Sequence, residues 1–327
     1  MRDSIPRWQD ILLQGFSSAA QLLDFLHIPG DEISTLAEHE FKTRVPRGFA
    51  ARMERGNPKD PLLLQVLATK DELELAPGFV RDPLDEVNAN PISGLIHKYH
   101  GRVLLTITGS CAVNCRYCFR RYFPYQDNNP GRMGWPLAID YIAHDPSIHE
   151  VILSGGDPLL ASDSVLAQLY EKFAAIPHVK TLRIHTRIPV VLPERIQNEL
   201  LNIIQHTRLQ TVVVLHSNHA NELTEDVAAA CRSLRQAGCH VLNQSVLLKG
   251  VNDNADVLVA LSERLFACGV LPYYLHLLDK VQGAQHFDVA LDDALILFGM
   301  LQRRLPGYLV PRLAREEPGE HHKTLFC

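Results

Sequence analysis

The chain has 327 residues, of which 46% are hydrophobic and 21% are charged, and its formal net charge is -5. This length suits one large α/β domain or two smaller ones with a substantial buried core. The slightly acidic balance argues against a surface that coats nucleic acid, so no direct nucleic-acid binding is expected. Residues 1–16 carry charges and a proline, and no segment reaches the roughly 20 apolar residues of a membrane helix. A cytoplasmic protein without membrane association is therefore predicted.

Turns and charges dominate residues 1–95. Helical patterns are predicted for residues 17–26 and 32–41. Prolines interrupt the stretch that follows, at Pro58, Pro61, Pro77, Pro83 and Pro91. The sequence therefore predicts a helical N-terminal region followed by an irregular wrap.

From Arg102 onward, short apolar and β-branched runs alternate with amphipathic segments. The runs predict strands over residues 102–108, 150–154, 181–186, 211–216, 240–248 and 272–278. Apolar spacings of three and four predict helices over residues 164–176, 194–206, 224–237 and 256–268. Gly238 and Gly269 stand where helix C-caps are expected.

Strands that alternate with helices indicate an α/β protein with a parallel sheet. Six strands are fewer than the eight that close a full barrel, so the expected architecture is an open, partial (β/α)6 barrel. The chemistry of such a fold lies at the carboxyl ends of its strands. We divide the chain into an N-terminal region (1–95), a barrel core (96–305) and a C-terminal segment (306–327).

Three of the seven cysteines crowd into eight positions after the first predicted strand, as Cys111, Cys115 and Cys118. Their C-x3-C-x2-C spacing is a poor disulfide framework and predicts a [4Fe–4S] cluster, because thiolates are the natural ligands of iron–sulfur clusters. Three ligands leave one iron of the cube open for another molecule. A zinc site with a fourth ligand from elsewhere is the alternative. The scattered cysteines are expected to fill the core: Cys231, Cys239 and Cys268.

This cysteine loop resembles that of the radical S-adenosylmethionine (radical SAM) superfamily, which implies that the open iron binds S-adenosylmethionine. The second predicted strand ends in Ser154, Gly155, Gly156 and Asp157. The resemblance implies that these four residues contact the methionine amino group of the cofactor. Two glycines let backbone approach a ligand closely, although a tight structural turn would also explain them.

Four stretches resemble the lysine 2,3-aminomutases: residues 102–105 (RVLL), 188–193 (IPVVLP), 243–253 (NQSVLLKGVND) and 272–274 (PYY). The resemblance is closest to the short bacterial branch that makes (R)-β-lysine for modification of elongation factor P. It implies an isomerase that moves the amino group of L-lysine from C2 to C3. It also implies pyridoxal 5′-phosphate, an electron donor, and a functional link to elongation factor P and its lysyl-ligase.

The same resemblance implies roles for several cofactor-binding residues. Lys323 matches the lysine that carries pyridoxal phosphate, although residues 320–322 replace the glycines that precede it in the family. Tyr99 and Arg102 match positions that bind the cofactor phosphate, and Arg102 could instead be a surface charge at the start of a strand.

His216 and Gln244 match residues near S-adenosylmethionine. A buried, hydrogen-bonded core histidine is the alternative for His216.

The substrate has charged groups to be recognised. Arg120 matches the arginine that holds the substrate carboxylate, a role that suits the two parallel N–H donors of a guanidinium. Arg121 beside it is expected to face elsewhere. Asp279 matches a carboxylate that binds the distal ammonium, and Glu316 stands where the family has a second aspartate.

Two departures concern the structural zinc of longer family members. Asn254 replaces one zinc ligand and the sequence given ends at Cys327, so no zinc is expected, and the oligomeric state is left unassigned. Two other functions stay open. One is a radical SAM enzyme without pyridoxal phosphate that activates a protein or modifies RNA, and the other is a non-enzymatic metal-binding protein.

Overall fold

A computed structural model of the chain describes residues 7–30, 33–128 and 131–326. These ranges contain a nine-stranded sheet whose strands are neighbours in sequence order. The strands are β1 (Leu95–Tyr99), β2 (Arg102–Thr108), β3 (Glu150–Gly155), β4 (Thr181–Thr186), β5 (Gln210–His216), β6 (His240–Val246), β7 (Leu271–His276), β8 (Arg312–Arg315) and β9 (Thr324–Phe326). The six predicted strands correspond to β2 through β7.

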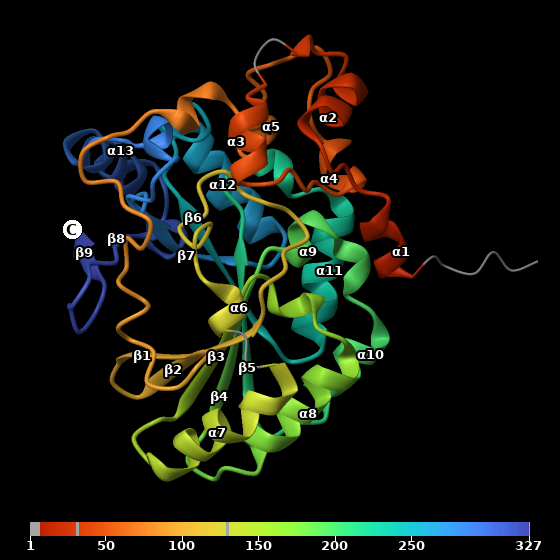
Figure 1. Cartoon of the computed structure of the whole chain (residues 1–327), viewed down its shortest axis with the longest axis vertical. Helices are drawn as coiled ribbons and strands as arrows, with labels where there is room; N and C mark the ends of the chain where they lie inside the picture. Colours follow the sequence, from red (N-terminus) through yellow and green to blue (C-terminus); the bar gives the residue numbers. More distant parts are fainter. Residues whose placement is uncertain (1–6, 31–32, 129–130, 327) are drawn as a thin grey trace, which may run out of the picture.

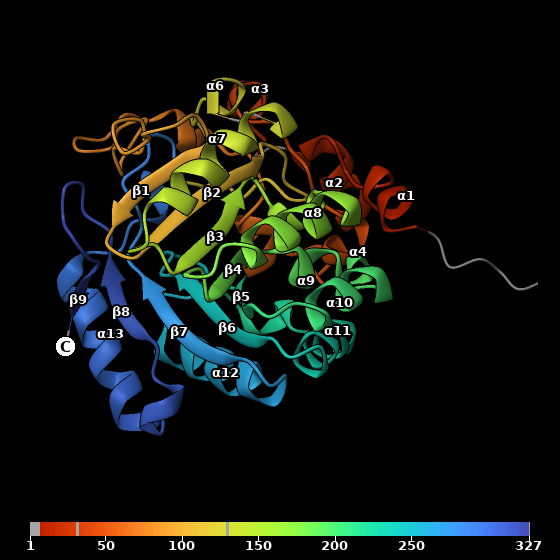
Figure 2. The same ribbon diagram turned by 90° about the horizontal axis from the view of Figure 1, so that it is seen from below.

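Strands β2 to β8 pair in parallel, whereas β1 and β9 join the two edges in antiparallel fashion. Figure 2 shows the sheet bent into an arc, and its strand order leaves β1 and β9 as unpaired edges. The predicted open, partial β/α barrel is thereby confirmed.

Three strands were not predicted: β1, β8 and β9. They have five, four and three residues, too few for an alternating pattern to stand out in the sequence. Their pairing comes from the neighbouring strand, and β8 adds a seventh parallel strand to the six expected.

Helices cover the outer face of the arc (Figure 2). The four predicted ones are α8 (Asp163–Ala174), α10 (Asn198–Gln205), α11 (Glu225–Gln236) and α12 (Ala255–Ala267), and the others in this part are α6 (Tyr125–Asn128), α7 (Gly131–His144), α9 (Ile188–Val191) and α13 (Leu291–Arg304). Gly238 and Gly269 follow α11 and α12 with φ of +93° and +74°, a left-handed conformation that favours glycine. Both predicted C-caps are confirmed.

The N-terminal region is helical and then irregular, as predicted. Its helices are α1 (Trp8–Leu13), α2 (Ala19–Leu26), α3 (Thr35–Glu40), α4 (Arg47–Ala50) and α5 (Pro61–Leu64), which lie together beside the barrel (Figure 1). Arg116 of the cysteine loop is fully buried. It donates to the Glu72 carboxylate at 2.8 Å and to the Ala37 carbonyl at 3.2 Å. The N-terminal region thus fixes the cysteine loop from outside the barrel.

Strand β4 presents polar side chains to the inside of the barrel. Leu182 and Ile184 are buried in the core, whereas Arg183 and His185, which alternate with them along the strand, are less buried. Because side chains alternate across a strand, these two polar residues face inward. An interior of this kind suits charged ligands better than an apolar one does.

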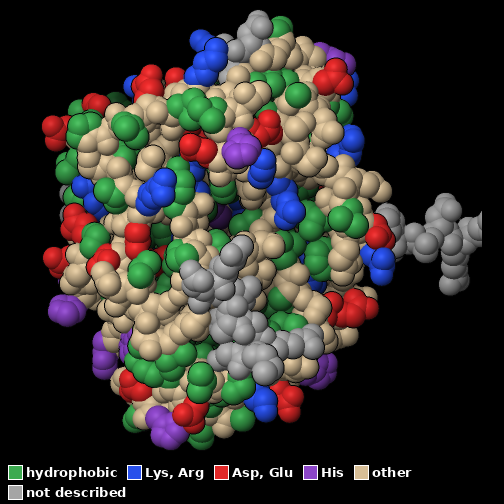
Figure 3. All heavy atoms as spheres, in the orientation of Figure 1, with side chains coloured by type: hydrophobic (Ala, Val, Ile, Leu, Met, Phe, Trp, Pro, Cys, Tyr) green, Lys and Arg blue, Asp and Glu red, His purple; other side chains and the backbone are tan. Residues whose placement is uncertain are grey.

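Cys231, Cys239 and Cys268 are buried, which confirms their predicted place in the core, and Cys327 lies outside the described residues. Acidic and basic side chains are interspersed on the face drawn in Figure 3. Among the described helices, none is both long enough and apolar enough to cross a lipid bilayer. The boundaries at residues 95 and 305 stay a prediction.

Candidate active site

The cysteine loop leaves the carboxyl end of β2. Cys111, Cys115 and Cys118 are free and partly buried on it. Burial raises the pKa of Cys111 well above its usual value, and Cys118, Asp157 and Cys115 raise it further. Burial likewise raises the pKa of Cys118 to about 11, with a further contribution from Cys115. Burial and the neighbouring sulfurs thus keep the Cys111 and Cys118 thiols protonated unless a cation is bound among the three cysteines.

The donor set fits an iron–sulfur cluster. Three sulfurs on one loop provide ligands of the right chemistry and leave room for a fourth group on the remaining iron. As they are placed, no three His, Cys, Asp or Glu side chains in the described part of the chain form a ready site for a metal ion. The fit therefore rests on the donor chemistry and on the mutual repulsion of the thiolates.

The loop after β3 is hydrogen-bonded to the start of the cysteine loop. The Gly156 amide donates to the Thr108 carbonyl at 2.7 Å, and the Asp157 amide donates to the Ser110 carbonyl at 2.8 Å. A Cβ at Gly156 would lie 2.2 Å from that Ser110 oxygen, and Gly155 has φ of +116°. Only glycine permits this approach, which sets the position of the first cysteine.

Asp157 braces the ends of β3 and β4. Its carboxylate accepts from the Thr186 hydroxyl at 2.7 Å and from the amides of Leu159, Arg187 and Ile188. Burial raises its pKa to about 6 despite these four donors. Both oxygens are thus engaged within the protein, so Asp157 would act on the cofactor through the backbone that it holds.

Arg120 lies buried at the inner side of the cysteine loop. Its Nε and Nη2 each donate to the Glu86 carboxylate at 2.7 Å, and its Nη1 donates to the Ser154 hydroxyl at 2.9 Å. A guanidinium has five N–H groups. These contacts use three, which leaves one on each terminal nitrogen, enough for the two oxygens of a substrate carboxylate.

The β8–β9 hairpin brings Glu316 and Lys323 together. Arg315 pairs with Thr324 in that hairpin. Glu316 and Lys323 are the next residues toward the hairpin loop, so they face each other. The Lys323 ammonium donates to Glu316 Oε2, and Lys98 of β1 donates to Oε1 at 3.3 Å. Burial would raise the pKa of Glu316, but the ammonium groups of Lys323 and Lys98 lower it to about 2. Glu316 therefore links β1 to the β8–β9 hairpin as a carboxylate.

Asp279 follows β7 and lies near this pair. Burial raises its pKa to about 7, the Glu316 charge adds to the rise, and Lys323 opposes it. Glu86 also raises this pKa, and Lys98 also lowers it. A further cation beside the buried carboxyl would favour its ionised form.

Tyr99 and Arg102 lie at the opposite end of β2 from the cysteines. The Arg102 guanidinium lies 4.6 Å from the centre of the Tyr99 ring. Burial raises the pKa of Tyr99, and Glu316 adds to the rise through its charge and a hydrogen bond. Tyr99 and Lys323 thus both interact with Glu316. The guanidinium of Arg102 stacks on the Tyr99 ring.

His216 ends β5, and Gln244 lies beside it in the register of β6. His216 Nε2 lies 3.0 Å from the Tyr117 hydroxyl, and the two rings stack with centres 5.6 Å apart. Burial lowers the pKa of His216 well below its usual value, and Arg187 lowers it further. The imidazole is neutral and sits beside the residue that precedes Cys118.

Several residues of this site were not singled out from the sequence. Glu86 comes from the irregular wrap, and Arg187 directly follows β4. His185 is a third case: its Nε2 is buried, and no described residue hydrogen-bonds to it. A signal existed for His185, since polar residues at alternate positions of a buried strand point into a barrel. No local pattern marked Glu86.

Comparison with known proteins agrees with this geometry. A model of the radical SAM superfamily matches residues 105–261. The chain is 51% identical to an L-lysine 2,3-aminomutase of Haemophilus influenzae, over 98% of this chain and 95% of that protein. It is 50% identical to the Escherichia coli L-lysine 2,3-aminomutase, over 97% and 93%. It is 36% identical to the Clostridium subterminale L-lysine 2,3-aminomutase, over 97% and 76%.

The barrel and its cysteine loop define a radical SAM enzyme, a class that uses a [4Fe–4S] cluster and S-adenosylmethionine. Within that class, the chain belongs to the L-lysine 2,3-aminomutase family and is an isomerase.

Proposed function

We propose that this enzyme converts L-α-lysine to (R)-β-lysine with pyridoxal 5′-phosphate on Lys323 and a [4Fe–4S] cluster on Cys111, Cys115 and Cys118. We further propose that the product serves the modification of elongation factor P through its lysyl-ligase. Most of the support comes from one observation: Lys323 contacts Glu316, and both lie close enough to the buried Asp279 to shift its pKa.

The charges of the site match those of lysine. The two remaining N–H groups of Arg120 would take the α-carboxylate. The distal ammonium would lie between Asp279 and Glu316 and relieve the repulsion between their carboxylates. Recognition of both ends selects lysine over amino acids with an uncharged side chain.

Pyridoxal phosphate, when bound at Lys323, supplies a conjugated π system that can hold an unpaired electron next to the migrating nitrogen. Glu316 holds the free Lys323 ammonium in place until the cofactor is bound. Tyr99 and Arg102 are proposed to hold the phosphate, because Tyr99 contacts the same Glu316 and Arg102 is the cation stacked on Tyr99.

Ser154, Gly155, Gly156, His216 and Gln244 are proposed to surround S-adenosylmethionine. The first three adjoin the cysteine loop, and the other two lie side by side on β5 and β6. Neutral His216 can accept or donate a hydrogen bond without bringing a charge to the cofactor. The contribution of these residues is orientation, together with exclusion of molecules that would quench a radical.

Covalent cofactor attachment tests the assignment of Lys323. Chain loaded with pyridoxal phosphate is treated with borohydride, and the modified lysine is identified by peptide mass spectrometry. We expect the label at Lys323 and its loss in Lys323→Ala. Lys98→Ala is the matched control, because Lys98 shares the Glu316 carboxylate and should leave the label in place. Label retained on another lysine in Lys323→Ala would contradict the assignment.

Turnover separates the aminomutase from a radical SAM enzyme of another activity. Reduced enzyme, S-adenosylmethionine and L-lysine are incubated anaerobically, and α- and β-lysine are resolved by chromatography. We expect β-lysine with the (R) configuration. Mass spectrometry of elongation factor P from cells with and without the enzyme tests the proposed destination. If the enzyme converts free lysine but the mass of elongation factor P is the same with and without it, only the proposed use of β-lysine on elongation factor P is refuted.

A further inference from the structure

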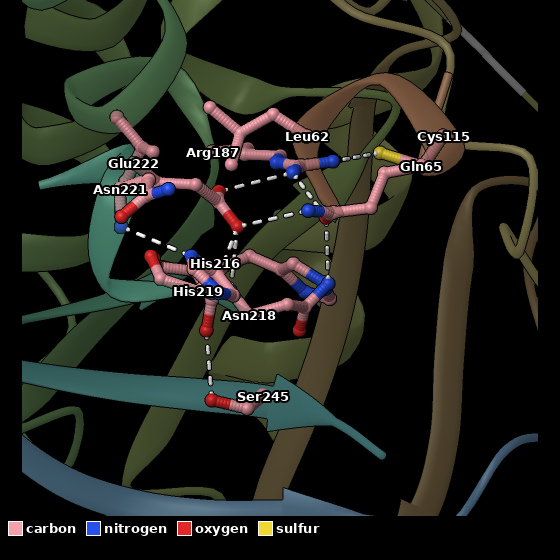
Figure 4. Close-up of polar contacts among 12 residues, drawn as sticks. Leu62, Gln65, Cys115, Arg187, His216, Asn218, His219, Asn221, Glu222 and Ser245 are labelled. Carbon is pink, nitrogen blue, oxygen red and sulfur yellow. Dashed lines mark hydrogen bonds and ion pairs between the residues drawn. The ribbon is translucent and has the colours of Figure 1, made fainter. Parts of the chain in front are cut away.

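Arg187 brings a buried positive charge to the cysteine loop. It directly follows β4, and its side chain is 6% exposed. Figure 4 shows its guanidinium between Cys115 and Glu222. Its Nη1 lies 2.7 Å from the Cys115 sulfur. Nothing in the sequence near either residue predicts this contact, which joins positions 72 residues apart.

The guanidinium is held in this orientation through its Nη2, which has two acceptors. Its Nη2 donates to Gln65 Oε1 at 2.7 Å and to Glu222 Oε2 at 3.0 Å. Glu222 is fully buried, and its other oxygen accepts from the amides of Asn218 and His219. An arginine fixed in this way keeps one terminal nitrogen for the sulfur.

The main chain of Arg187 is fixed as well. Its amide donates to the Asp157 carboxylate at 2.7 Å. Asp157 in turn holds the loop that packs on Ser110. The donor and the sulfur are therefore parts of one packed unit, so their separation is set by the fold.

Three other arginines near the loop have different partners. Arg44 donates to the Cys111 carbonyl at 2.9 Å and not to its sulfur. Arg120 is paired with Glu86, and Arg121 donates to Glu72 at 2.8 Å. Arg187 differs from these in placing an N–H group directly on a sulfur of the loop.

Hydrogen bonds to the sulfurs of an iron–sulfur cluster, and positive charge near it, are among the factors that set its reduction potential. One-electron reduction adds a negative charge that spreads over the cluster and its sulfur ligands. A charged donor at one of those sulfurs stabilises the reduced form more than the oxidised form. Burial strengthens the effect, because little water screens the charge.

We propose that Arg187 is a positioning residue that donates to Cys115 Sγ and raises the reduction potential of the cluster, so that an electron is accepted more readily. This rests on the proposed function, in which Cys115 is a cluster ligand. Glu222 and Gln65 hold the guanidinium in the orientation that makes the donation.

The test is an anaerobic reductive titration followed by electron paramagnetic resonance, without S-adenosylmethionine. Arg187→Met removes both the charge and the donor, and Arg187→Lys keeps the charge but loses the planar fork. Arg195→Met is the matched control. Arg195 is also a fully buried arginine, and it pairs with Asp163 at 2.7 Å on the outer side of the barrel. Iron and sulfide per chain are measured for every protein, and affinity for S-adenosylmethionine is measured separately.

We expect the midpoint potential to become more negative in Arg187→Lys and still more negative in Arg187→Met, with Arg195→Met unchanged. A loaded Arg187→Met with the wild-type midpoint would overturn the inference. If Arg187→Met keeps the wild-type midpoint potential but loses affinity for S-adenosylmethionine, the inference is also overturned, because Arg187 would then be a ligand of S-adenosylmethionine.

If Arg187→Met does not hold a cluster, Arg187→Lys decides alone, and a wild-type midpoint in that variant overturns the inference. Wild-type chain that binds no iron after reconstitution would refute the cluster itself. The failure of the proposed function is thereby distinguished from the failure of this inference.

Discussion

Asp279 is the group whose substitution should change the pH dependence of turnover most clearly. The perturbation is Asp279→Asn, which keeps the size of the side chain and removes its charge. The pKa of Asp279 is raised to about 7 by burial and by the Glu316 charge. The substrate ammonium, with an ordinary pKa near 10.4, stays charged throughout the range of interest. Only the ionised carboxyl can pair with it.

The magnitude follows from that pKa. With a pKa of about 7, Asp279 is roughly one-tenth ionised at pH 6 and roughly nine-tenths ionised at pH 8. The kcat/KM for lysine reports groups of the free enzyme and should rise about tenfold over this interval. In Asp279→Asn that rise should be absent and kcat/KM should be low at every pH. Initial rates of β-lysine formation at low lysine concentration measure it.

Stability provides the accompanying control. The folded chain holds the Asp279 proton to a higher pH than the unfolded chain does. The contribution of this group to stability is therefore lost as pH rises from about 4 to about 7. Asp279→Asn lacks this loss and should unfold at a temperature no lower than wild type at pH 8. A folded variant that kept the tenfold rise in kcat/KM would refute the reasoning.

Two further substitutions test the framework of the site. Glu72→Gln removes the carboxylate from the fully buried guanidinium of Arg116 and should lower the free energy of unfolding by about 3–5 kcal/mol, measured by urea denaturation. Gly156→Ala places a methyl group 2.2 Å from the Ser110 carbonyl, so the cysteine loop must shift. Iron and sulfide per chain after reconstitution should fall in that variant.

Each of these substitutions has a control of the same kind. Glu225→Gln breaks an exposed ion pair and should change the free energy of unfolding by less than about 1 kcal/mol. Gly48→Ala adds a methyl group with nothing within 4 Å and should leave the iron content unchanged. Equal effects in test and control variants would contradict the roles assigned to Glu72 and Gly156.

The spacing of residues in the sequence was enough to predict the framework of this protein. Strand and helix periodicity depends on which face of each element is buried, and that pattern is local. The same is true of Gly238 and Gly269, whose left-handed backbone conformation was expected from their positions after a helix. The cysteine loop is also local, since its ligands lie within eight residues of one another.

The sequence alone also singled out Arg120, Asp279, Glu316 and Lys323, through their match to a family pattern. It could not indicate that Glu86 fills one side of the Arg120 fork, because the wrap that carries Glu86 has no periodicity. Short strands such as β8 and β9 likewise could not be predicted from the sequence, because only their pairing with neighbouring strands defines them.

Tertiary structure decided what surrounds each charge. The contact of Arg187 with Cys115, and the shared Glu316 between Lys98 and Lys323, join segments far apart in the chain. Electrostatic interactions of this kind depend on distance and burial, which no local pattern encodes. The sequence by itself therefore determined the fold class and the residues that we propose to carry the chemistry, whereas folding determined which of those charges are paired and which are left for a ligand.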